Sequence, residues 1–444
     1  MKDRLSRRTF LQGTAAATGV TVLADPFSSR SYAQNAKVRY ANFGVGGRGG
    51  AHVGPAASQN LVACCDVNEN TANDVAKKNN AKPYTDWRKV FDEMMKDFDA
   101  VFVATPDHSH FPIAYTAVKN GKHCYCEKPL THGVWEARKL AELVKEKKVA
   151  TQMGNQGHAG GDIRKIVTWV QGGVIGEIKE VHTWTNRPVW PQGIDRPKDT
   201  PACPANLNWD AFIGVAPMRP YHPCYQPFAW RGWKDYGCGA VGDMGCHTWD
   251  CVWWSMEAVA PSAAELLKIV DRKPESFPRQ MVGRLEFPKT AKRGPFTATW
   301  YEGGLKPEIP EGLKAAGKDK VGVSGSIFIG SKGWIISEGD YSDNPQIWPK
   351  ELSDQHKSMK VEIPGSPGHH DEYIMACRGD KPWDFPKSNF MYGGPLVEAM
   401  NLVNVAMWLD KKITWNPVTM KCPGTPEADA LIKREYRPGW VKVT

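Results

Sequence analysis

Short apolar runs alternate with amphipathic stretches over the first third of the chain. The apolar runs have the pattern of buried strands and cover residues 37–43, 60–65, 100–104 and 123–126. Helical spacing fills the gaps between them, at 51–58, 71–79, 87–96 and 113–120. Strands and helices that alternate in this way predict an α/β domain built on a doubly wound parallel sheet.

A glycine-rich run follows the first predicted strand at once. It contains Gly44, Gly46, Gly47, Arg48 and Gly49, in the spacing GxGxxG. Glycines allow a tight turn and a close backbone approach to a pyrophosphate, and the next helix offers N–H donors at its positive end. A plain tight turn would need the same residues. The strand before the run and the helix after it favour a dinucleotide site.

An acidic residue ends the second predicted strand. Asp66 lies about twenty residues beyond the glycines, where a carboxylate can accept hydrogen bonds from the adenosine ribose. No arginine or lysine adjoins Asp66 to neutralise a 2′-phosphate. The sequence therefore predicts NAD as the cofactor, with NADP less favoured.

Polar residues follow two more of the predicted strands. Thr105, Pro106 and His110 come after one strand, and Glu127 and Lys128 come after the next. Ligands of open α/β sheets bind at the carboxyl ends of the strands. We therefore expect Thr105, Pro106, His110 and Glu127 to border the cofactor and Lys128 to lie near its nicotinamide.

The second half of the chain carries an acid and a histidine at helical spacing. Asp243 and His247 are four residues apart in Gly239-Ala240-Val241-Gly242-Asp243-Met244-Gly245-Cys246-His247, so on a helix they share a face. Such a pair is suited to proton transfer. The spacing fits a capping aspartate and a core histidine equally well.

Residues 186–235 form a long stretch rich in proline and tryptophan. Long loops are often functional, and aromatic faces stack on sugar rings, so Trp230 and Arg231 are candidate substrate contacts. The alternative is a stiff lid that packs only on its own domain.

His369 and His370 are adjacent, so on regular structure they cannot both face one metal ion, and no metal site is expected. Residues 372–378 have the pattern of a surface helix.

Length and composition narrow the class of protein. The chain has 444 residues, 41% of them hydrophobic and 24% charged, which suggests two globular domains. No apolar run approaches the roughly 18 residues of a membrane span, so no membrane anchor is expected. The net charge is +9, and no basic stripe is interleaved with aromatic residues, so nucleic acid is not an expected partner.

Residues 1–33 have the pattern of an export signal. A basic start precedes a weakly apolar stretch, and Ser31-Tyr32-Ala33 offers small residues to a signal peptidase. Ser6-Arg7-Arg8-Thr9-Phe10-Leu11 resembles a twin-arginine signal. We expect a periplasmic or otherwise exported protein that meets the twin-arginine translocation machinery. An ordinary basic terminus is the alternative.

The glycine loop, Ala104-Thr105-Pro106 with His110, and Glu127-Lys128-Pro129 together resemble the Gfo/Idh/MocA oxidoreductases. The resemblance implies an NAD-binding Rossmann domain at 37–155 and a substrate-binding α+β domain at 156–444. The second domain would have an open, mostly antiparallel sheet. Because such sheets commonly pair subunits in this family, a homo-oligomer is expected.

The resemblance also implies roles for single residues. In sugar- and inositol-oxidising members, the residues that correspond to Lys128, Asp243 and His247 form the catalytic set. His247 would take a hydroxyl proton, Lys128 would stabilise the oxygen, and Asp243 would hold His247. Asn155 and Gln156 are expected beside the cofactor, and His158 beside the substrate.

The function implied is hydride transfer between a tightly held NAD(H) and a secondary alcohol or carbonyl of a sugar, polyol or glycoside. One alternative is an NAD-dependent glycosidase or lyase that oxidises its substrate only transiently. A second alternative is a sugar-binding protein without catalysis.

Overall fold

The computed structural model describes residues 37–443. The predicted export signal at 1–33 lies outside the described residues. No helix within 37–443 has both the length and the apolar character that crossing a membrane requires.

The first sheet has six parallel strands in the order β3-β2-β1-β4-β5-β6. The prediction of a doubly wound parallel sheet is confirmed. The strands are β1 (Arg39–Phe43), β2 (Asn60–Cys65), β3 (Lys82–Tyr84), β4 (Ala100–Val103), β5 (His123–Cys126) and β6 (Thr151–Met153). The helices between them are α3 (Gly50–Gln59), α4 (Glu69–Asn79), α5 (Trp87–Met94), α6 (Asp107–Lys119) and α7 (Val134–Lys147).

Helix α6 begins earlier than the sequence pattern predicts. It starts at Asp107, directly after Pro106, and so includes His110. Proline before the first helical residue and an acid in the first turn both favour a helix start here. The polar residues after β4 therefore belong partly to a helix, which fixes their directions.

The second sheet has eight strands in the order β13-β12-β11-β7-β10-β9-β8-β14. Only β7 and β10 run parallel, so the expected open, mostly antiparallel sheet is confirmed. The strands are β7 (Ile178–Trp184), β8 (Ala263–Val270), β9 (Gln280–Phe287), β10 (Phe296–Glu302), β11 (Gly325–Gly330), β12 (Trp334–Glu338), β13 (Gln346–Trp348) and β14 (Ile413–Thr414).

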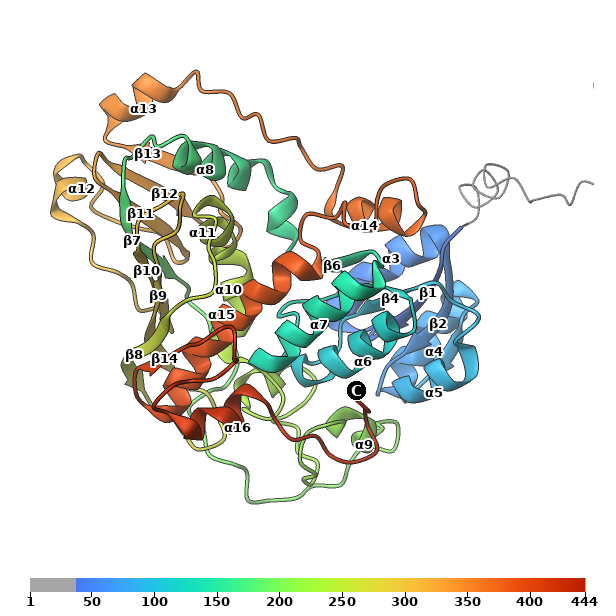
Figure 1. The fold of residues 1–444 in the computed structure, drawn as a ribbon. Helices are drawn as coiled ribbons and strands as arrows, with labels where there is room; N and C mark the ends of the chain where they lie inside the picture. The colour runs from blue at the N-terminus through green and yellow to red at the C-terminus, as the bar shows by residue number, and fades with distance from the viewer. Residues whose placement is uncertain (1–36, 444) are drawn as a thin grey trace, which may run out of the picture. The chain divides into compact units, whose positions relative to one another are not determined.

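Helix α15 (Phe390–Leu409) connects the two sheets. It packs on α7 and β6 on one side, and on β8, β9 and α10 (Gly239–Thr248) on the other (Figure 1). Its residues are buried almost all the way round, which explains why apolar residues occupy every face. The other helices are α8 (Gly161–Gln171), α9 (Trp209–Ile213), α11 (Asp250–Ser255), α12 (Glu311–Ala315), α13 (Lys350–His356), α14 (His369–Cys377) and α16 (Asp429–Ile432).

Helix α14 packs against the first sheet, beside α3 (Figure 1). Tyr373 is fully buried, and its hydroxyl donates to the Val101 carbonyl at 3.0 Å. Its ring contacts those of Tyr40, Phe102 and Tyr125. The prediction of a surface helix is therefore wrong. Its buried positions include His369 and Glu372, whose polar character conceals the inward face from a hydropathy pattern.

The irregular stretch from 186 to 238 lies across the first domain. Asn208 N–H donates to the Val67 carbonyl at 2.8 Å, and Glu69 N–H donates to the Asn206 carbonyl at 2.9 Å. The ring of His108 lies 2.7 Å from the Phe212 carbonyl. The alternative of a lid that packs only on its own domain is therefore wrong.

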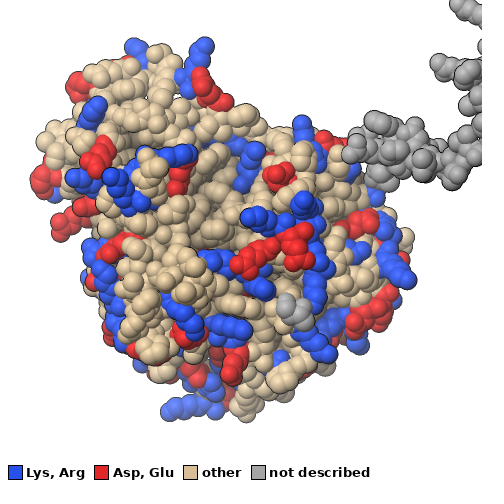
Figure 2. Space-filling view, viewed as in Figure 1, with Lys and Arg blue, Asp and Glu red and all other residues tan. Residues whose placement is uncertain are grey.

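On the face in Figure 2, basic and acidic side chains are interspersed over both domains.

Candidate active site

A cleft of about 700 Å³ opens at the carboxyl ends of β1, β2, β4 and β5. Both domains and the 186–238 stretch contribute to its wall. The predicted residues that line it are Gly44, Gly46, Gly47, Arg48, Asp66, Thr105, Pro106, Glu127, Lys128, Gln156, Trp230, Arg231, Asp243 and His247. The structure thus brings the predicted cofactor loop and the predicted catalytic set into one space.

The glycine loop leaves no room for side chains at two positions. A Cβ on Gly49 would lie 2.0 Å from the Gly44 carbonyl oxygen. Gly44 has φ +74°, and a Cβ there would lie 2.5 Å from the Ala104 carbonyl oxygen. Glycine is therefore required for the backbone to turn this tightly at the end of β1.

Asp66 holds this loop from the end of β2. Its Oδ2 accepts hydrogen bonds from the N–H groups of Val45 at 3.0 Å and Gly46 at 3.2 Å. The side chain is half-buried and also lines the cleft. Its carboxylate is therefore fixed at the cleft wall, where it faces any group bound beside the glycines.

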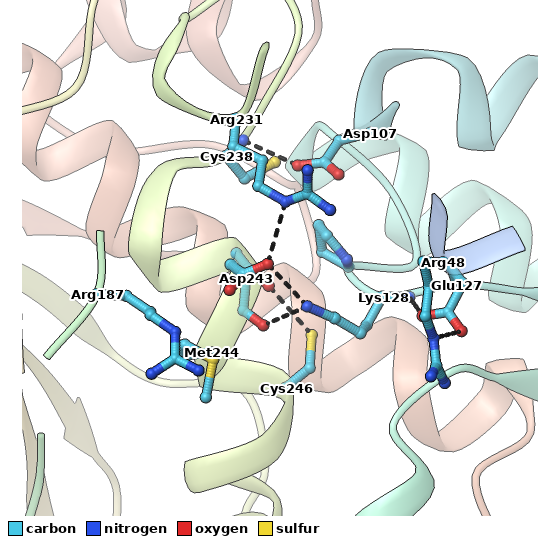
Figure 3. Close-up of polar contacts among 12 residues, drawn as sticks. Arg48, Asp107, Glu127, Lys128, Arg187, Arg231, Cys238, Asp243, Met244 and Cys246 are labelled. Carbon is cyan, nitrogen blue, oxygen red and sulfur yellow. Dashed lines mark hydrogen bonds and ion pairs between the residues drawn. The ribbon is translucent and has the colours of Figure 1, made fainter. Parts of the chain in front are cut away.

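Asp243, on α10, lies between two cations (Figure 3). Lys128 Nζ donates to Asp243 Oδ1 and to the Asp243 carbonyl, both at 2.8 Å. Arg231 Nε donates to the same Oδ1 at 3.3 Å. Burial alone would raise the pKa of Asp243, but the charges of Lys128 and Arg231 outweigh burial and hold that pKa below its usual range.

Lys128 is correspondingly kept charged. Burial would lower the pKa of its ammonium, but attraction to Asp243 raises it above the usual value. The pair is therefore an ammonium and a carboxylate, held in place inside the cleft. A fixed cation at this position can stabilise negative charge that develops on a substrate oxygen.

His247 lies one turn further along α10 and is 4% exposed. Among the described residues, its Nδ1 has no hydrogen-bond partner. Its ring meets the edge of Tyr341, with centroids 4.9 Å apart. Burial, and then the charge of Lys128, lower the pKa of His247 to about 3. The imidazole is therefore neutral near pH 7, and burial and the charge of Lys128 make it a weak base.

The expected contact between Asp243 and His247 is absent from the described residues. The Asp243 carboxylate bonds to Lys128 and Arg231 instead. Helical spacing places the two residues on one face, but two nearby cations attract the carboxylate more strongly than a neutral ring does. Asp243 therefore positions Lys128. The predicted direct hold on His247 is wrong, but the charge of Asp243 still acts to raise the pKa of His247.

Glu127 is the centre of a second polar group. Its Oε1 contacts Arg48 Nε at 2.8 Å and His52 Nε2 at 2.9 Å, and His52 Nδ1 lies 2.9 Å from His370 Nε2. Burial would raise the pKa of Glu127, but the contacts with His52 and Arg48 hold it far below its usual value. Figure 3 shows Arg48 laid against Glu127. His52 and His370 carry no local signal, since their partners are distant in the sequence.

Three predicted ligand contacts lie behind the cleft wall. The His110 nitrogens are each 2.7 Å from a backbone carbonyl, of Thr105 and Pro129. Asn155 donates to Asp250 at 3.1 Å, and His158 Nδ1 lies 3.0 Å from the same carboxylate. These side chains brace the wall, and their direct contact with a ligand stays a prediction.

Sequence reasoning missed several residues of the cleft. Arg187 lines it and pairs with Asp340 at 2.9 Å, and Phe228 and Tyr341 line it as well. All of these lie in irregular segments, where no periodicity marks them. Arg231 lies over the rings of Trp230, at 4.2 Å, and Phe228, at 4.7 Å. No three histidine, cysteine or acidic side chains within 37–443 are grouped to hold a metal ion.

Two protein-family models match the chain. Residues 38–155 match the NAD-binding Rossmann fold of the Gfo/Idh/MocA oxidoreductase family. Residues 161–266 match the C-terminal alpha/beta domain of the same family. Together the two segments cover about half of the chain.

Similar proteins include named enzymes. The chain is 28% identical to levoglucosan dehydrogenase of Pseudarthrobacter phenanthrenivorans over 167 residues, which are 37% of this chain and 34% of that protein. It is 29% identical to glycosyl hydrolase family 109 protein 1 of Akkermansia muciniphila over 153 residues, 32% of each. The chain thus spans about a third of the length of these curated relatives.

A solved structure shares the fold over most of the chain. The WlbA dehydrogenase of Bordetella pertussis, in complex with NADH and UDP-GlcNAcA, superposes with a TM-score of 0.59 at 18% identity. The match covers 86% of this chain and 99% of that one. The chain belongs to the Gfo/Idh/MocA oxidoreductase family and begins its fold with that family's NAD-binding Rossmann domain.

Proposed function

We propose that the chain transfers a hydride between a tightly held NAD(H) and a secondary alcohol or carbonyl carbon of a sugar, polyol or glycoside. One observation carries the proposal. Lys128, Asp243 and His247 line the same cleft as the glycine loop and Asp66. A proton acceptor and an oxyanion stabiliser therefore face the space beside the cofactor loop.

The residues present fit a dinucleotide. The loop at Gly44 and Gly49 is too tight for any Cβ, so its backbone can approach a pyrophosphate closely. Asp66 is fixed at the wall, where it would accept hydrogen bonds from the ribose. When bound, NAD supplies the hydride acceptor of the reaction.

The protein groups divide the remaining work. His247 is neutral, and it accepts the hydroxyl proton of the substrate as the C–H bond breaks, when the negative charge that develops on the oxygen offsets the charge of Lys128. The ammonium of Lys128 donates a hydrogen bond to that oxygen and stabilises its negative charge. Asp243 keeps Lys128 charged and oriented, and Arg231 donates to the same carboxylate. Carbonyl reduction uses the same groups in reverse.

The substrate side of the cleft suits a hydroxylated ring. Trp230 and Phe228 contribute aromatic rings to the wall. Arg231, which lies over both rings, and Arg187 offer hydrogen-bond donors. A levoglucosan dehydrogenase among the relatives and a structure solved with a nucleotide sugar support the class of substrate. The test mixes the purified chain, loaded with NAD, with a panel of sugars and polyols and follows the absorbance of the reduced nicotinamide.

The matched variants are His247→Gln and His356→Gln. His356 lies on α13 and does not line the cleft. We expect His247→Gln to slow hydride transfer at least a hundredfold, within the usual range for loss of a general base, and His356→Gln to leave it unchanged. Wild-type rates in His247→Gln would refute the assigned role.

We propose that the cofactor stays bound through repeated turnovers. The 186–238 stretch binds beside Val67, Glu69 and Thr85, at the adenosine end of the expected cofactor site. A dinucleotide there would leave only after this stretch moved away. Desalting followed by denaturation should release about one NAD per chain, and a cofactor-free eluate would refute retention.

We also propose that residues 1–33 direct export through the twin-arginine machinery. That route carries folded proteins, so a loaded cofactor can travel with the chain. Mass spectrometry of the periplasmic protein should find the mature terminus near Ala33 in the wild type. A variant with Arg7→Lys and Arg8→Lys should stay in the cytoplasm.

We also propose that subunits pair through the open sheet. Light scattering measures the molar mass in solution and so tests whether the chain forms a homo-oligomer.

A second candidate function is glycoside cleavage through transient oxidation. The relative named as a glycosyl hydrolase family 109 protein favours it. Lys128 and His247 would serve the same hydride step, and the electrons would return to the product. Release of the aglycone from an aryl glycoside, with deuterium taken up from heavy water and no net reduced cofactor, would select this function over the first.

A further inference from the structure

A second cavity, of about 350 Å³, lies among the start of α7, the helices α15 and α16, and the chain end. It shares no lining residue with the cleft. Its polar side chains include His132, Lys234, Asn404 and Arg434, and its apolar walls include Phe277 and Trp408. A cavity of this size, with a few polar groups among apolar ones, is typical of a small-molecule site.

Two cations in this cavity form no direct ion pair with an acidic side chain among the described residues. Arg434 contacts His132 Nε2 at 3.1 Å and the Asp235 carbonyl at 3.4 Å. Lys234 Nζ lies 4.6 Å from the centre of the Trp408 ring. Burial lowers the pKa of both side chains, that of Arg434 to about 10, so the guanidinium remains charged at neutral pH.

The acids nearby are already engaged or exposed. The carboxylate of Asp235 forms a close ion pair with Arg219. Glu136 accepts from the Tyr436 hydroxyl at 2.6 Å and from Gly133 N–H at 2.8 Å. Glu435 is exposed at the cavity edge. Neither cation therefore has a direct ion-pair partner in the protein, although the charge of Asp235 acts on Lys234, and an anionic ligand would supply a direct partner.

Two further atoms of the lining residues are buried without a hydrogen-bond partner: His132 Nδ1 and Asn404 Oδ1. Such atoms are rare in folded proteins and often belong to ligand or water sites. An amide oxygen is an acceptor, so it suits a hydroxyl group of the ligand. The aromatic walls at Phe277 and Trp408 suit the carbon skeleton of a small organic molecule.

We propose that this cavity binds a small hydroxylated organic anion through Arg434 and Lys234. The anionic group is a carboxylate or a phosphate, the two groups that a guanidinium recognises best. The site is separate from the cleft, so the proposal does not rest on the proposed function.

The cavity wall leads to the catalytic residues along two segments. The ring of His132, four residues after Lys128, lies 2.9 Å from the Gly237 carbonyl. Asn404 donates to the Cys238 carbonyl at 3.0 Å, and α10, which carries Asp243, begins at the next residue. The cavity wall therefore contacts the two chain segments that carry Lys128 and Asp243.

The experiment titrates the full, NAD-loaded chain with sodium gluconate and with inorganic phosphate at constant ionic strength, in a calorimeter. We expect saturable binding of at least one probe, one per chain, and the stronger probe identifies the anionic group. The variants Arg434→Gln and Lys234→Gln should each weaken it at least tenfold. Lys433→Gln removes an exposed neighbouring charge, and Arg231→Gln removes a cation of the cleft, so both should bind as the wild type does.

Absence of saturable binding of both probes to the wild type would overturn the proposal. Binding that falls in Arg231→Gln and persists in Arg434→Gln would overturn it too, because the probe would then occupy the cleft. Should Arg434→Gln fail to fold, Lys234→Gln decides between the outcomes. These results are independent of whether the chain oxidises any sugar.

Discussion

Asp107 offers a direct test of the electrostatics around the catalytic pair. It is the first residue of α6, is 3% exposed, and accepts a hydrogen bond from Cys238 N–H at 3.0 Å. Burial raises its pKa to about 7, although Arg231 and Lys128 act in the opposite direction. An ordinary aspartate titrates near 3.9. The perturbation is Asp107→Asn, which keeps an acceptor for Cys238 and removes the titration.

The two pKa values set the size of the effect. At any pH between these two pKa values, Asp107 holds a proton in the folded chain that it has lost in the unfolded chain. The stabilisation of the folded chain by this proton is greatest below about pH 4 and is lost as the pH rises to about 7. By the linkage relation, the free energy of unfolding falls by about 3 kcal/mol between pH 5 and pH 8 because of Asp107 alone.

The assay is urea unfolding of wild type and Asp107→Asn, followed by tryptophan fluorescence at pH 5 and pH 8. The stability of the variant relative to the wild type should increase by about 3 kcal/mol from pH 5 to pH 8. Other buried acids, such as Glu136 and Glu302, affect both proteins equally and cancel. Asp92→Asn on the exposed face of α5 serves as the control. A stability difference that is the same at both pH values would refute the reasoning.

Three further predictions follow from single contacts. Gly49→Ala forces a Cβ onto the Gly44 carbonyl and should abolish NAD retention after desalting, whereas Gly54→Ala, with open space around it, should retain the cofactor. Tyr373→Ala should lower the free energy of unfolding by about 3 to 5 kcal/mol and Tyr373→Phe by about 1, measured in urea. His247 should show no NMR titration between pH 5 and pH 9, because its pKa lies near 3, and a midpoint near 6.5 would contradict this.

The sequence predicts the first sheet well because its signals are local. The glycines from 44 to 49 and Asp66 belong to one strand–helix–strand unit, and apolar runs mark the strands on either side. The second sheet and the catalytic set came from the family resemblance, since a pair spaced like Asp243 and His247 also occurs in ordinary cores.

What the sequence could not predict depends on contacts between distant segments. Asp243 bonds to Lys128 and Arg231, which lie on other elements, and helical spacing contains no information about them. The same is true of Glu127 with His52, and of His52 with His370. Arg187 and Tyr341 reach the cleft from irregular segments, where hydropathy has no period to follow.

Helix α14 has a consequence for biosynthesis. Tyr40, Phe102 and Tyr125 on the first sheet are covered by a helix that is translated more than two hundred residues after β6. At about 5 to 20 residues per second, this apolar surface waits roughly 10 to 40 seconds for its cover. The first domain therefore cannot finish folding on the ribosome ahead of the second. A chaperone that shields apolar surface would have its longest opportunity to bind during that interval.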